Sequence, residues 1–488
     1  MAATTLQEKL DGLSAELAKA TPPPFGHACK KLYSFDDDYV NLNNGSFGTC
    51  PNHVLEAYKH YLAESERRPD IWMRTGFKPL LERSRKELAQ LVNCPVEDLV
   101  LLTNATTGVN AILRGMAGTW SATKREAILV YDTVYGACGR TAQYIVDSHP
   151  SLQLSVVKVP VTYPIAHDDF LQRTRETLDQ AKRDGVRVRV AILDTISSLP
   201  GVVVPWQQTV QLLREHDVLS LVDGAHAVGQ IPLNLRDADP DFFVSNCHKW
   251  LSAHRGCAFL YTPKRNQHLV PGMPTSHYYV SPTDAPAKGP SLIPTDAPSN
   301  YVAVWESNGT QDQSNFLCIP AALEFRRWLG GEDRIMGYTT RLAQRGGEIL
   351  SRRLGHGSTV MDLAPNRILT SSMVNVSLPL DLDSLRSAEA EAEAMPSLAF
   401  VASRFQTALA DRYPTFVPFY VHADTIWFRV SAQVWLEESD FDWLADAILD
   451  TVQHLGWSLL AAEPSSSKTK TEANGVVDDQ QSVEAKAA

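Results

Sequence analysis

Val-Leu-Ser-Leu-Val-Asp-Gly-Ala-His occupies residues 218–226 of the chain, and Ser-Asn-Cys-His-Lys-Trp follows at residues 245–250. The apolar run before Asp223 predicts a buried strand of a parallel sheet, because such strands are covered on both faces. Open α/β folds bind ligands at the carboxyl ends of their parallel strands, so Asp223 is expected at a ligand-binding edge. Lys249 comes after a second apolar run, residues 241–244, among small and polar residues that could reach a phosphate.

Asp223 and Lys249 together suit one cofactor. An aspartate at the sheet edge can hold a pyridinium nitrogen protonated, and a lysine can form a Schiff base with an aldehyde. The sequence therefore predicts a pyridoxal-phosphate site with Lys249 as the Schiff-base residue. The alternative is that Asp223 is an ordinary loop residue and Lys249 a solvated surface charge. The combined order of strand, Asp-Gly-Ala-His, strand and His-Lys-Trp favours the functional interpretation.

Length and composition indicate a globular protein of more than one domain. The chain has 488 residues, of which 44% are hydrophobic and 21% charged. No apolar run approaches the roughly 18 residues of a membrane span, and the first residues lack the apolar core of a secretory signal. We therefore expect a cytoplasmic protein. The net charge of −11 and the lack of a basic block argue against nucleic acid or anionic membrane as a partner.

The cysteines argue against both disulfides and a metal site. Seven cysteines are scattered along the chain without a Cys-x-x-Cys pair, which disfavours a disulfide framework and a zinc site. Most are expected to be small buried residues. Cys138, in Tyr-Gly-Ala-Cys-Gly at residues 135–139, is a candidate for more than packing.

Four regions are expected along the chain. Residues 1–30 form an N-terminal arm with a short helix and Thr-Pro-Pro-Pro, and residues 31–331 form the large cofactor-binding domain. There, apolar runs alternate with helical patterns, which predicts an α/β fold with a mostly parallel sheet. Residues 332–462 read as a smaller α+β domain, and residues 463–488 as a disordered tail. A surface excursion is expected near residues 271–300. The apolar runs are 99–102, 127–131, 188–193, 218–222, 242–244 and 258–261, and the helical patterns are 79–92, 170–183, 316–329 and 397–411.

A phosphate site is expected after the first of these strands. Residues 103–110, Thr-Asn-Ala-Thr-Thr-Gly-Val-Asn, supply hydroxyls and small residues where a helix begins, and the positive end of a helix attracts an anion. The alternative is a plain helix cap made by Thr106. Gly309-Thr310 is a second turn that could reach a phosphate, although alone it is an ordinary turn.

Tyr135 and Arg429 are the remaining candidates from chemistry alone. Tyr135 follows the apolar run 127–131, where it could stack on a planar ring or act as a general acid. The alternative is a tyrosine of the core. Arg429 lies in an apolar strand, a costly place for a guanidinium unless it meets an anion such as a substrate carboxylate. The alternative is an internal salt bridge.

The motifs together resemble the class V aminotransferase-like family of pyridoxal-phosphate enzymes. The resemblance spans most of the chain. It implies fold type I of pyridoxal-phosphate enzymes, in which the large domain has a mostly parallel sheet of the seven-stranded type. It is carried by residues 41–48, 104–108, 135–139, 223–226, 246–250 and 429–433.

The family resemblance also implies residue roles. Asp223 would pair with the pyridine nitrogen, and His226 would lie close to the ring. Ser198 would approach the ring hydroxyl, and Thr310 would reach the phosphate of a neighbouring subunit, which implies a homodimer. The phosphate side would be formed by Thr106, Thr107, Asn246 and His248. The family's usual Asn-His-Gly-Ser-Phe-Gly is Asn-Asn-Gly-Ser-Phe-Gly at residues 43–48, so a titrating role at Asn44 is in doubt.

Within the family the chain is most similar to the hercynylcysteine sulfoxide lyases. That resemblance implies β-elimination on hercynylcysteine sulfoxide, giving ergothioneine through a sulfenate, with pyruvate and ammonia. Lys249 would remove the α-proton, Tyr135 would protonate or orient the leaving sulfur, and Arg429 would fix the carboxylate, with Asn44 and Ser46 also on the substrate side. The alternatives are an isopenicillin-N-epimerase-like enzyme, a cysteine desulfurase and a catalytically silent scaffold subunit. Candidates for a cation–π contact with the trimethylammonium group are Trp72, Tyr278 and Tyr279.

Overall fold

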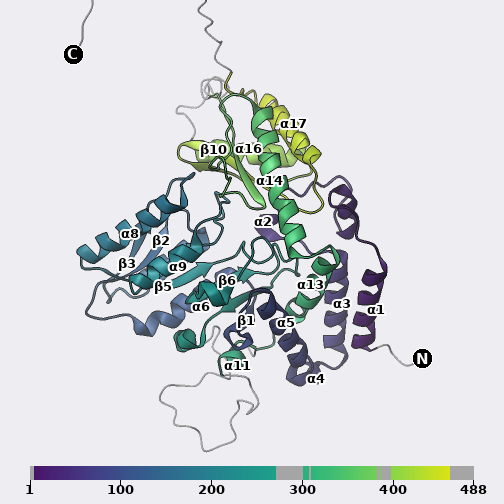
Figure 1. Cartoon of the computed structure of the whole chain (residues 1–488), viewed down its shortest axis with the longest axis vertical. Helices are drawn as coiled ribbons and strands as arrows, with labels where there is room; N and C mark the ends of the chain where they lie inside the picture. Colours follow the sequence, from purple (N-terminus) through teal and green to yellow (C-terminus); the bar gives the residue numbers. More distant parts are fainter. Residues whose placement is uncertain (1–4, 271–299, 307–308, 382–384, 386–396, 462–488) are drawn as a thin grey trace, which may run out of the picture.

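The structure is a computed structural model, and it describes residues 5–270, 300–306, 309–381, 385 and 397–461. Figure 1 shows a large α/β part with a smaller part above it. Nearly all of the excursion expected at residues 271–300 lies outside the described residues, as do the tail 463–488 and both tyrosines at 278 and 279.

The large part is built on a sheet of seven strands, which confirms the predicted sheet. Its strands are β1 (Leu99–Leu102), β2 (Glu126–Tyr131), β3 (Leu154–Val159), β4 (Arg187–Asp194), β5 (Leu219–Asp223), β6 (Phe242–Asn246) and β7 (Ala258–Tyr261). Their order is β1-β7-β6-β5-β4-β2-β3. Neighbours among β2 to β6 are parallel, whereas β7 pairs antiparallel with β1 and β6.

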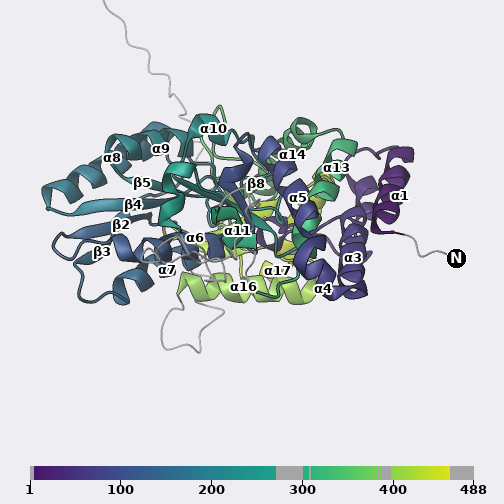
Figure 2. The ribbon, with the colours of Figure 1, turned by 90° about the horizontal axis from the view of Figure 1, so that it is seen from below.

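Helices cover both faces of this sheet. Those of the large part are α2 (Asn44–Phe47), α3 (Asn52–Arg67), α4 (Pro69–Ile71), α5 (Lys78–Leu91), α6 (Ala105–Gly115), α7 (Gly136–Asp147), α8 (His167–Arg183), α9 (Trp206–Glu215), α10 (Leu235–Ala238), α11 (Asn300–Glu306), α12 (Ser314–Leu317) and α13 (Ile319–Trp328). Figure 2 shows α8 and α9 on one side of the strands and α6 and α7 on the other. The helical stretch predicted over residues 316–329 is helical except near Cys318, where α12 ends and α13 begins, just before Pro320 in the first turn of α13.

Successive side chains of a strand point to opposite faces of the sheet, so each strand contributes to the core on both sides. In β2, Leu129 belongs to the core beneath α8 and α9, whereas Ile128 and Val130 belong to the core beneath α6 and α7. This burial on both faces is why the central strands are largely apolar.

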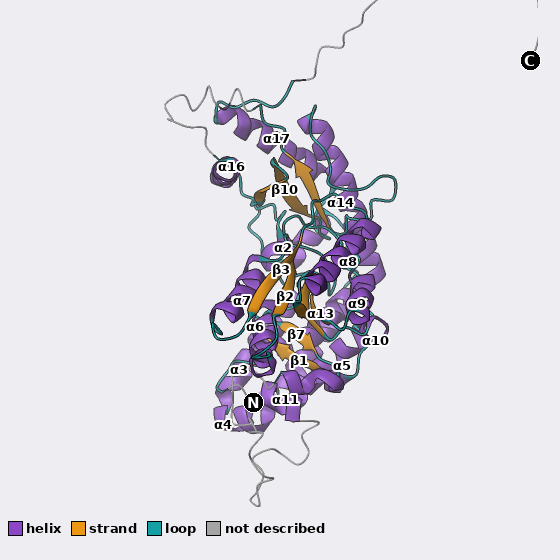
Figure 3. Cartoon of the chain, turned by 90° about the vertical axis from the view of Figure 1, so that its left-hand side faces the viewer, coloured by secondary structure: helices purple, strands orange, loops and turns teal. Residues whose placement is uncertain are grey.

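The smaller part is α+β, as predicted. It has an antiparallel sheet of β8 (Met373–Ser377), β10 (Thr425–Ser431) and β9 (Phe419–His422), in the order β8-β10-β9. Helices α14 (Glu332–Leu354), α16 (Leu398–Arg412) and α17 (Glu438–His454) pack around it. Figure 3 shows this layer above the large sheet. The central strand β10 carries Arg429 into the region between the two parts.

The N-terminal segment is joined to both parts. Helix α1 (Leu6–Lys19) packs against α3 and α13 of the large part. Residues 21–24 lie in neither a helix nor a strand, and Cys29 and Leu42 then enter the core of the small part. The residue limits of the four regions therefore stay a prediction. Within the described ranges, no helix combines the length and the apolar character needed to cross a membrane.

Candidate active site

Three neighbouring strands end in polar side chains at one edge of the large sheet. Asp194 ends β4, Asp223 ends β5 and Asn246 ends β6, and all three side chains are buried. Asp194 lies beside Asp223 in the register of the two parallel strands. The apolar runs thus deliver two carboxylates and an amide to the carboxyl edge, where α/β folds bind their ligands.

Asp223 is held by two donors. Its Oδ1 accepts a hydrogen bond from the backbone N–H of Ala225 at 3.0 Å. Its Oδ2 accepts one from Sγ of Cys138 in α7 at 3.2 Å. Burial, followed by the charge of Asp223, raises the pKa of the Cys138 thiol well above its ordinary value, so the thiol stays protonated and donates. Cys138 is therefore more than a packing residue.

Asp194 is a site residue that the sequence analysis missed. Burial and then the neighbouring charge of Asp223 raise the pKa of Asp194 well above its ordinary value, while Lys249 acts in the opposite direction. The protonated form of Asp194 is therefore favoured. The sequence contains a feature that could have identified Asp194, because this aspartate directly follows the apolar run 188–193, just as Asp223 follows the run 218–222.

Lys249 reaches the same edge from the loop after β6. Its Nζ lies 3.2 Å from Nε2 of His226. Burial, and then the charge of Arg429, lower the pKa of Lys249 to about 8, against opposing effects of Asp223, Cys138 and Asp194. The amine is therefore half deprotonated at about pH 8, and the neutral form is the one in which an amine attacks a carbonyl.

The segment around Asn44 is clamped onto the backbone of Lys249. Nδ2 of Asn44 donates a hydrogen bond to the carbonyl of Lys249 at 3.2 Å. Gly48 has a φ of +66°, and a Cβ at that position would lie 1.7 Å from the carbonyl oxygen of His248. Only glycine allows this approach. Helix α2 therefore lies directly against the Schiff-base candidate.

The N-terminus of α6 offers the predicted phosphate-binding groups. Asn104 caps the helix by accepting from the backbone N–H of Thr107 at 2.8 Å, so the alternative of Thr106 as the cap is wrong. Oδ1 of Asn246 accepts from the backbone N–H of Ala105 at 2.9 Å, which joins β6 to the helix. Thr106 stands in the first turn of the helix, where free N–H groups and the helix dipole favour an anion.

His248 stands beside this end of the site. Its Nδ1 lies 2.8 Å from the carbonyl oxygen of Cys257, so it carries the proton and donates. Burial lowers the pKa of His248 to about 4, and the nearby cations Lys249 and Arg255 add to the decrease. A nearby anion such as a phosphate would raise it again.

Arg429 is a buried cation without an anionic partner. The side chain is 2% exposed. Nη1 donates to the carbonyl of Ser198 at 2.7 Å, and Nη2 donates to Oδ1 of Asn43 at 2.9 Å and to the hydroxyl of Ser46 at 3.1 Å. Nε has no partner in the described structure, and burial lowers the pKa of the guanidinium to about 10. No carboxylate of the described residues forms a salt bridge with Arg429, so the alternative of an internal salt bridge is wrong.

Ser198 is brought to the site by contacts between the two parts of the molecule. Its carbonyl accepts from Arg429, and Asn375 of β8 is joined to Gly201 by two hydrogen bonds, from the Gly201 N–H at 2.9 Å and to the Gly201 carbonyl at 3.0 Å. Tyr420 donates a further hydrogen bond to Oδ1 of Asn375 at 2.9 Å. Asn43 and Asn375 were not among the predicted site residues.

Tyr135 and Thr310 lie at the surface of the single chain. Tyr135 precedes the first turn of α7, three residues before Cys138, and is 47% exposed, so the alternative of a core tyrosine is wrong. Thr310 is exposed in the loop between α11 and α12. In the described structure, no hydrogen bond joins Thr310 to the other predicted site residues. Trp72, proposed for a cation–π contact, is buried in the core of the large part.

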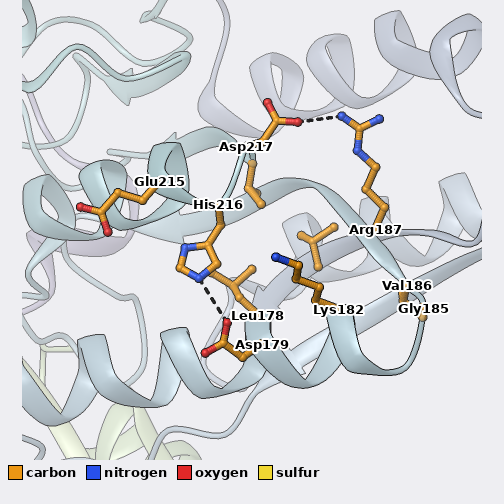
Figure 4. Close-up of a pocket in the computed structure, with 11 residues that line it drawn as sticks. Leu178, Asp179, Lys182, Gly185, Val186, Arg187, Glu215, His216 and Asp217 are labelled. Carbon is orange, nitrogen blue, oxygen red and sulfur yellow. Dashed lines mark hydrogen bonds and ion pairs between the residues drawn. The ribbon is translucent and has the colours of Figure 1, made fainter.

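A cavity of about 550 Å³ lies at the opposite edge of the sheet, where β4 and β5 begin, and contains none of these residues. Figure 4 shows its lining, in which His216 pairs with Asp179 at 3.5 Å and Arg187 with Asp217 at 2.9 Å. Arg187 and Asp217 neutralise one another at the surface. The described residues contain no group of three metal-ligating side chains, and all seven cysteines are free.

The carboxyl edge fits pyridoxal phosphate. Asp223 could hold the ring nitrogen, Lys249 could supply the amine, and the first turn of α6 could bind the phosphate. The unpaired guanidinium of Arg429 is left for an anionic group of a substrate. Each kind of group that the cofactor requires is therefore present at one edge of the sheet.

Comparison with known proteins agrees with this geometry. The family model "Aminotransferase class-V" matches residues 40–345. The chain is 32% identical to an L-cysteine desulfhydrase-like protein of Epichloe uncinata, with 87% of this chain and 95% of that protein covered. It is also 32% identical to the hercynylcysteine sulfoxide lyase of Schizosaccharomyces pombe, with coverage of 87% and 97%. A solved structure of a C-DES variant with glycine covalently linked to its pyridoxal-phosphate cofactor has a TM-score of 0.65 at 18% identity, covering 85% of this chain and 97% of that one.

The chain belongs to the aminotransferase class-V family. It is an enzyme of the fold that the sequence analysis predicted, and its cofactor is pyridoxal phosphate.

Proposed function

We propose that the enzyme is a carbon–sulfur lyase that acts by β-elimination on a cysteine-derived sulfoxide, with hercynylcysteine sulfoxide as its substrate. The sulfur would leave as a sulfenate, which a thiol reductant would convert to ergothioneine, and the three-carbon fragment would react with water to give pyruvate and ammonia. The relative from Schizosaccharomyces pombe supports this choice, since its name is hercynylcysteine sulfoxide lyase and 97% of its length is covered.

The unpaired Arg429 is the observation that carries the proposal. The buried guanidinium is bound only to neutral oxygens, so no negative charge balances its positive charge. The same charge lowers the pKa of Lys249. An α-amino acid carries a carboxylate beside its amine. A carboxylate on Arg429 therefore places the amine of an amino acid beside Lys249.

The side chains around Lys249 have distinct proposed roles. When bound, pyridoxal phosphate accepts the electrons released when a proton leaves the α-carbon of an amino acid. Lys249, with its lowered pKa, removes that proton, and Asp223 keeps the ring nitrogen protonated. The exposed Tyr135 would protonate or orient the leaving sulfur.

The remaining predicted residues bind and orient. Ser198 would interact with the ring hydroxyl, and His226 would lie close to the ring. Asn44, bound to the backbone of Lys249, and Ser46, bound to Arg429, would be on the substrate side. The phosphate side is formed by Thr106, Thr107, Asn246 and His248.

We further propose that the enzyme is a cytoplasmic homodimer. Thr310 would bind the phosphate of the partner subunit, which agrees with its exposure in the single chain. A monomeric enzyme with full activity in solution would contradict this assembly.

L-cysteine is the second candidate substrate, because the desulfhydrase-like relative is as similar to this chain as the sulfoxide lyase is. Elimination from cysteine would need the same residues and release sulfide. A cysteine desulfurase is less well supported, since it needs an accessible nucleophilic cysteine. Six of the seven cysteines are buried, and burial raises the pKa of the half-buried Cys50.

Product analysis tests the proposal. The purified enzyme is incubated with hercynylcysteine sulfoxide and a thiol reductant, and pyruvate and the thione are measured together. Equal amounts of both products are expected. Pyruvate and sulfide from L-cysteine alone would favour the desulfhydrase, alanine with persulfide the desulfurase, and an inverted amino acid the epimerase. Bound cofactor with no turnover of any of these would favour a scaffold subunit.

A further inference from the structure

Trp250 and His226 form a chain of hydrogen bonds that ends on Lys249. The indole Nε1–H of Trp250 donates to Nδ1 of His226 at 3.2 Å, and Nε2 of His226 lies 3.2 Å from Nζ of Lys249. Both Trp250 and His226 are buried. Neither contact follows from sequence spacing, because the positions of the ring nitrogens depend on how the two loops fold together.

The donor at Trp250 determines which nitrogen of His226 carries the proton. An indole N–H can only donate, so Nδ1 of His226 must present its lone pair. Burial lowers the pKa of His226 well below its ordinary value, and the nearby cations Lys249 and Arg429 lower it further. The imidazole is therefore neutral, and its single proton is on Nε2.

That proton faces Lys249. An ammonium group has three N–H donors and no lone pair, so it cannot accept the Nε2–H of His226. A neutral amine can. The tautomer set by Trp250 therefore favours the unprotonated form of Lys249.

We propose that Trp250 is a positioning residue. Through His226, it holds the amine of Lys249 in its unprotonated form, with the lone pair of Nζ directed at the Nε2–H of His226. The proposal deepens the proposed function, since the same amine would bind the cofactor and remove the α-proton. His226 is a fixed hydrogen-bond donor in this arrangement and does not act as a base toward Lys249.

Other charged groups also act on Lys249. Arg429 from β10 favours the neutral amine, whereas Asp223 from β5, Cys138 from α7 and Asp194 from β4 favour the ammonium form. At the sheet edge, Asp223 thus opposes deprotonation of Lys249, and Cys138 and Asp194 add to this effect only when they are ionised. The hydrogen bond from His226 supports Arg429 and burial against them.

The backbone of Trp250 is fixed as the relay requires. The buried Arg326 donates to the carbonyl of Trp250 at 2.7 Å and to the carbonyl of Gly229 at 3.0 Å. Gln230 donates through Nε2 to the carbonyl of His226 at 2.6 Å. Both ends of the Trp250–His226 hydrogen bond are therefore held by side chains outside the relay.

The test uses the full-length chain, stripped of cofactor and mixed with pyridoxal phosphate at different pH values. The association rate should rise as Lys249 loses its proton, with a midpoint at about 8 in the unchanged chain. Trp250→Phe removes the indole donor and frees His226 to accept from an ammonium. The midpoint should then move up by about one pH unit, a tenfold change in proton affinity.

Trp328→Phe is the matched control. It also removes an indole hydrogen bond, which Trp328 makes to the carbonyl of Ala20 at 2.8 Å, outside the relay. Its midpoint should equal that of the unchanged chain. An unshifted midpoint in Trp250→Phe would overturn the proposal, as would an equal shift in both variants.

A second measurement needs no variant of Trp250. Nitrogen-15 NMR of histidine-labelled chain, with the signal assigned by its loss in His226→Gln, reports which ring nitrogen carries the proton. Protonated Nε2 is expected, and protonated Nδ1 would overturn the proposal. Failure of the proposed function is distinguishable, because a chain that binds pyridoxal phosphate but does not cleave the sulfoxide would leave these results unchanged.

Discussion

Arg429→Gln tests the carboxylate receptor, because it removes the cation but keeps an N–H donor. The guanidinium has five N–H groups, and three hydrogen bonds to neutral oxygens leave two for a substrate carboxylate. A hydrogen bond to a charged group contributes about 1.5–3 kcal/mol, so the loss of two costs about 3–6 kcal/mol. The value of kcat/KM should therefore fall by roughly two to four orders of magnitude.

Arg85→Gln is the matched control, since Arg85 is also 2% exposed and also makes three hydrogen bonds. One of these joins Arg85 to the carboxylate of Glu306 at 3.4 Å. Breaking a buried ion pair costs about 3–5 kcal/mol of the free energy of unfolding, and the partly exposed Glu306 favours the lower end. Arg85→Gln should therefore lose stability and keep its kcat/KM.

The assays are pyruvate formation for kcat/KM and urea denaturation for the free energy of unfolding. The reasoning predicts opposite patterns, with activity lost in Arg429→Gln and stability lost in Arg85→Gln. A kcat/KM for Arg429→Gln close to that of the unchanged chain would refute the receptor role. So would equal losses of stability and activity in both variants, because the effect would then be structural.

Three further substitutions probe the site and its support. Lys249→Ala should abolish both the visible absorbance of bound cofactor and turnover, and a variant that still turns over would exclude Lys249 as the Schiff-base residue. Tyr135→Phe should keep the absorbance but lose much of the elimination, and full activity would remove Tyr135 from the mechanism. Gly48→Ala should lower the free energy of unfolding by about 3 kcal/mol or more, because its φ is +66° and the new Cβ would meet the carbonyl of His248. Urea denaturation checks this, and unchanged stability would contradict the clash.

The central strands of the large sheet could be predicted because both faces are buried, which makes each a continuous apolar run. The strands β3 and β9 were not found, and each lies at the edge of its sheet with several partly exposed residues. Exposure lets residues such as Lys158 into an edge strand, so the apolar signal weakens. The helical pattern over residues 316–329 did not reveal the break at Cys318, which precedes a proline in the first turn of α13.

The site was predictable where one residue type and its place after a strand suffice. Asp223 and Lys249 belong to this group, and Asp194 shows the same pattern but was overlooked. Asn43 and Asn375 could not be found in this way, since their roles depend on contacts between distant segments. The same holds for Trp250, whose effect on the proton of a histidine ring requires atomic positions.

The receptor guanidinium and the reactive amine are carried by different bodies of the molecule. Arg429 stands on the middle strand of the upper sheet, whereas Lys249 follows a strand of the lower one. A rotation of the small part against the large part would change the distance between Arg429 and Lys249, which bind two different groups of the substrate. The residues that bind the cofactor would keep their positions. Substrate length and cofactor affinity can thus drift apart over evolutionary time, which offers one physical route by which a single scaffold comes to serve many amino acids.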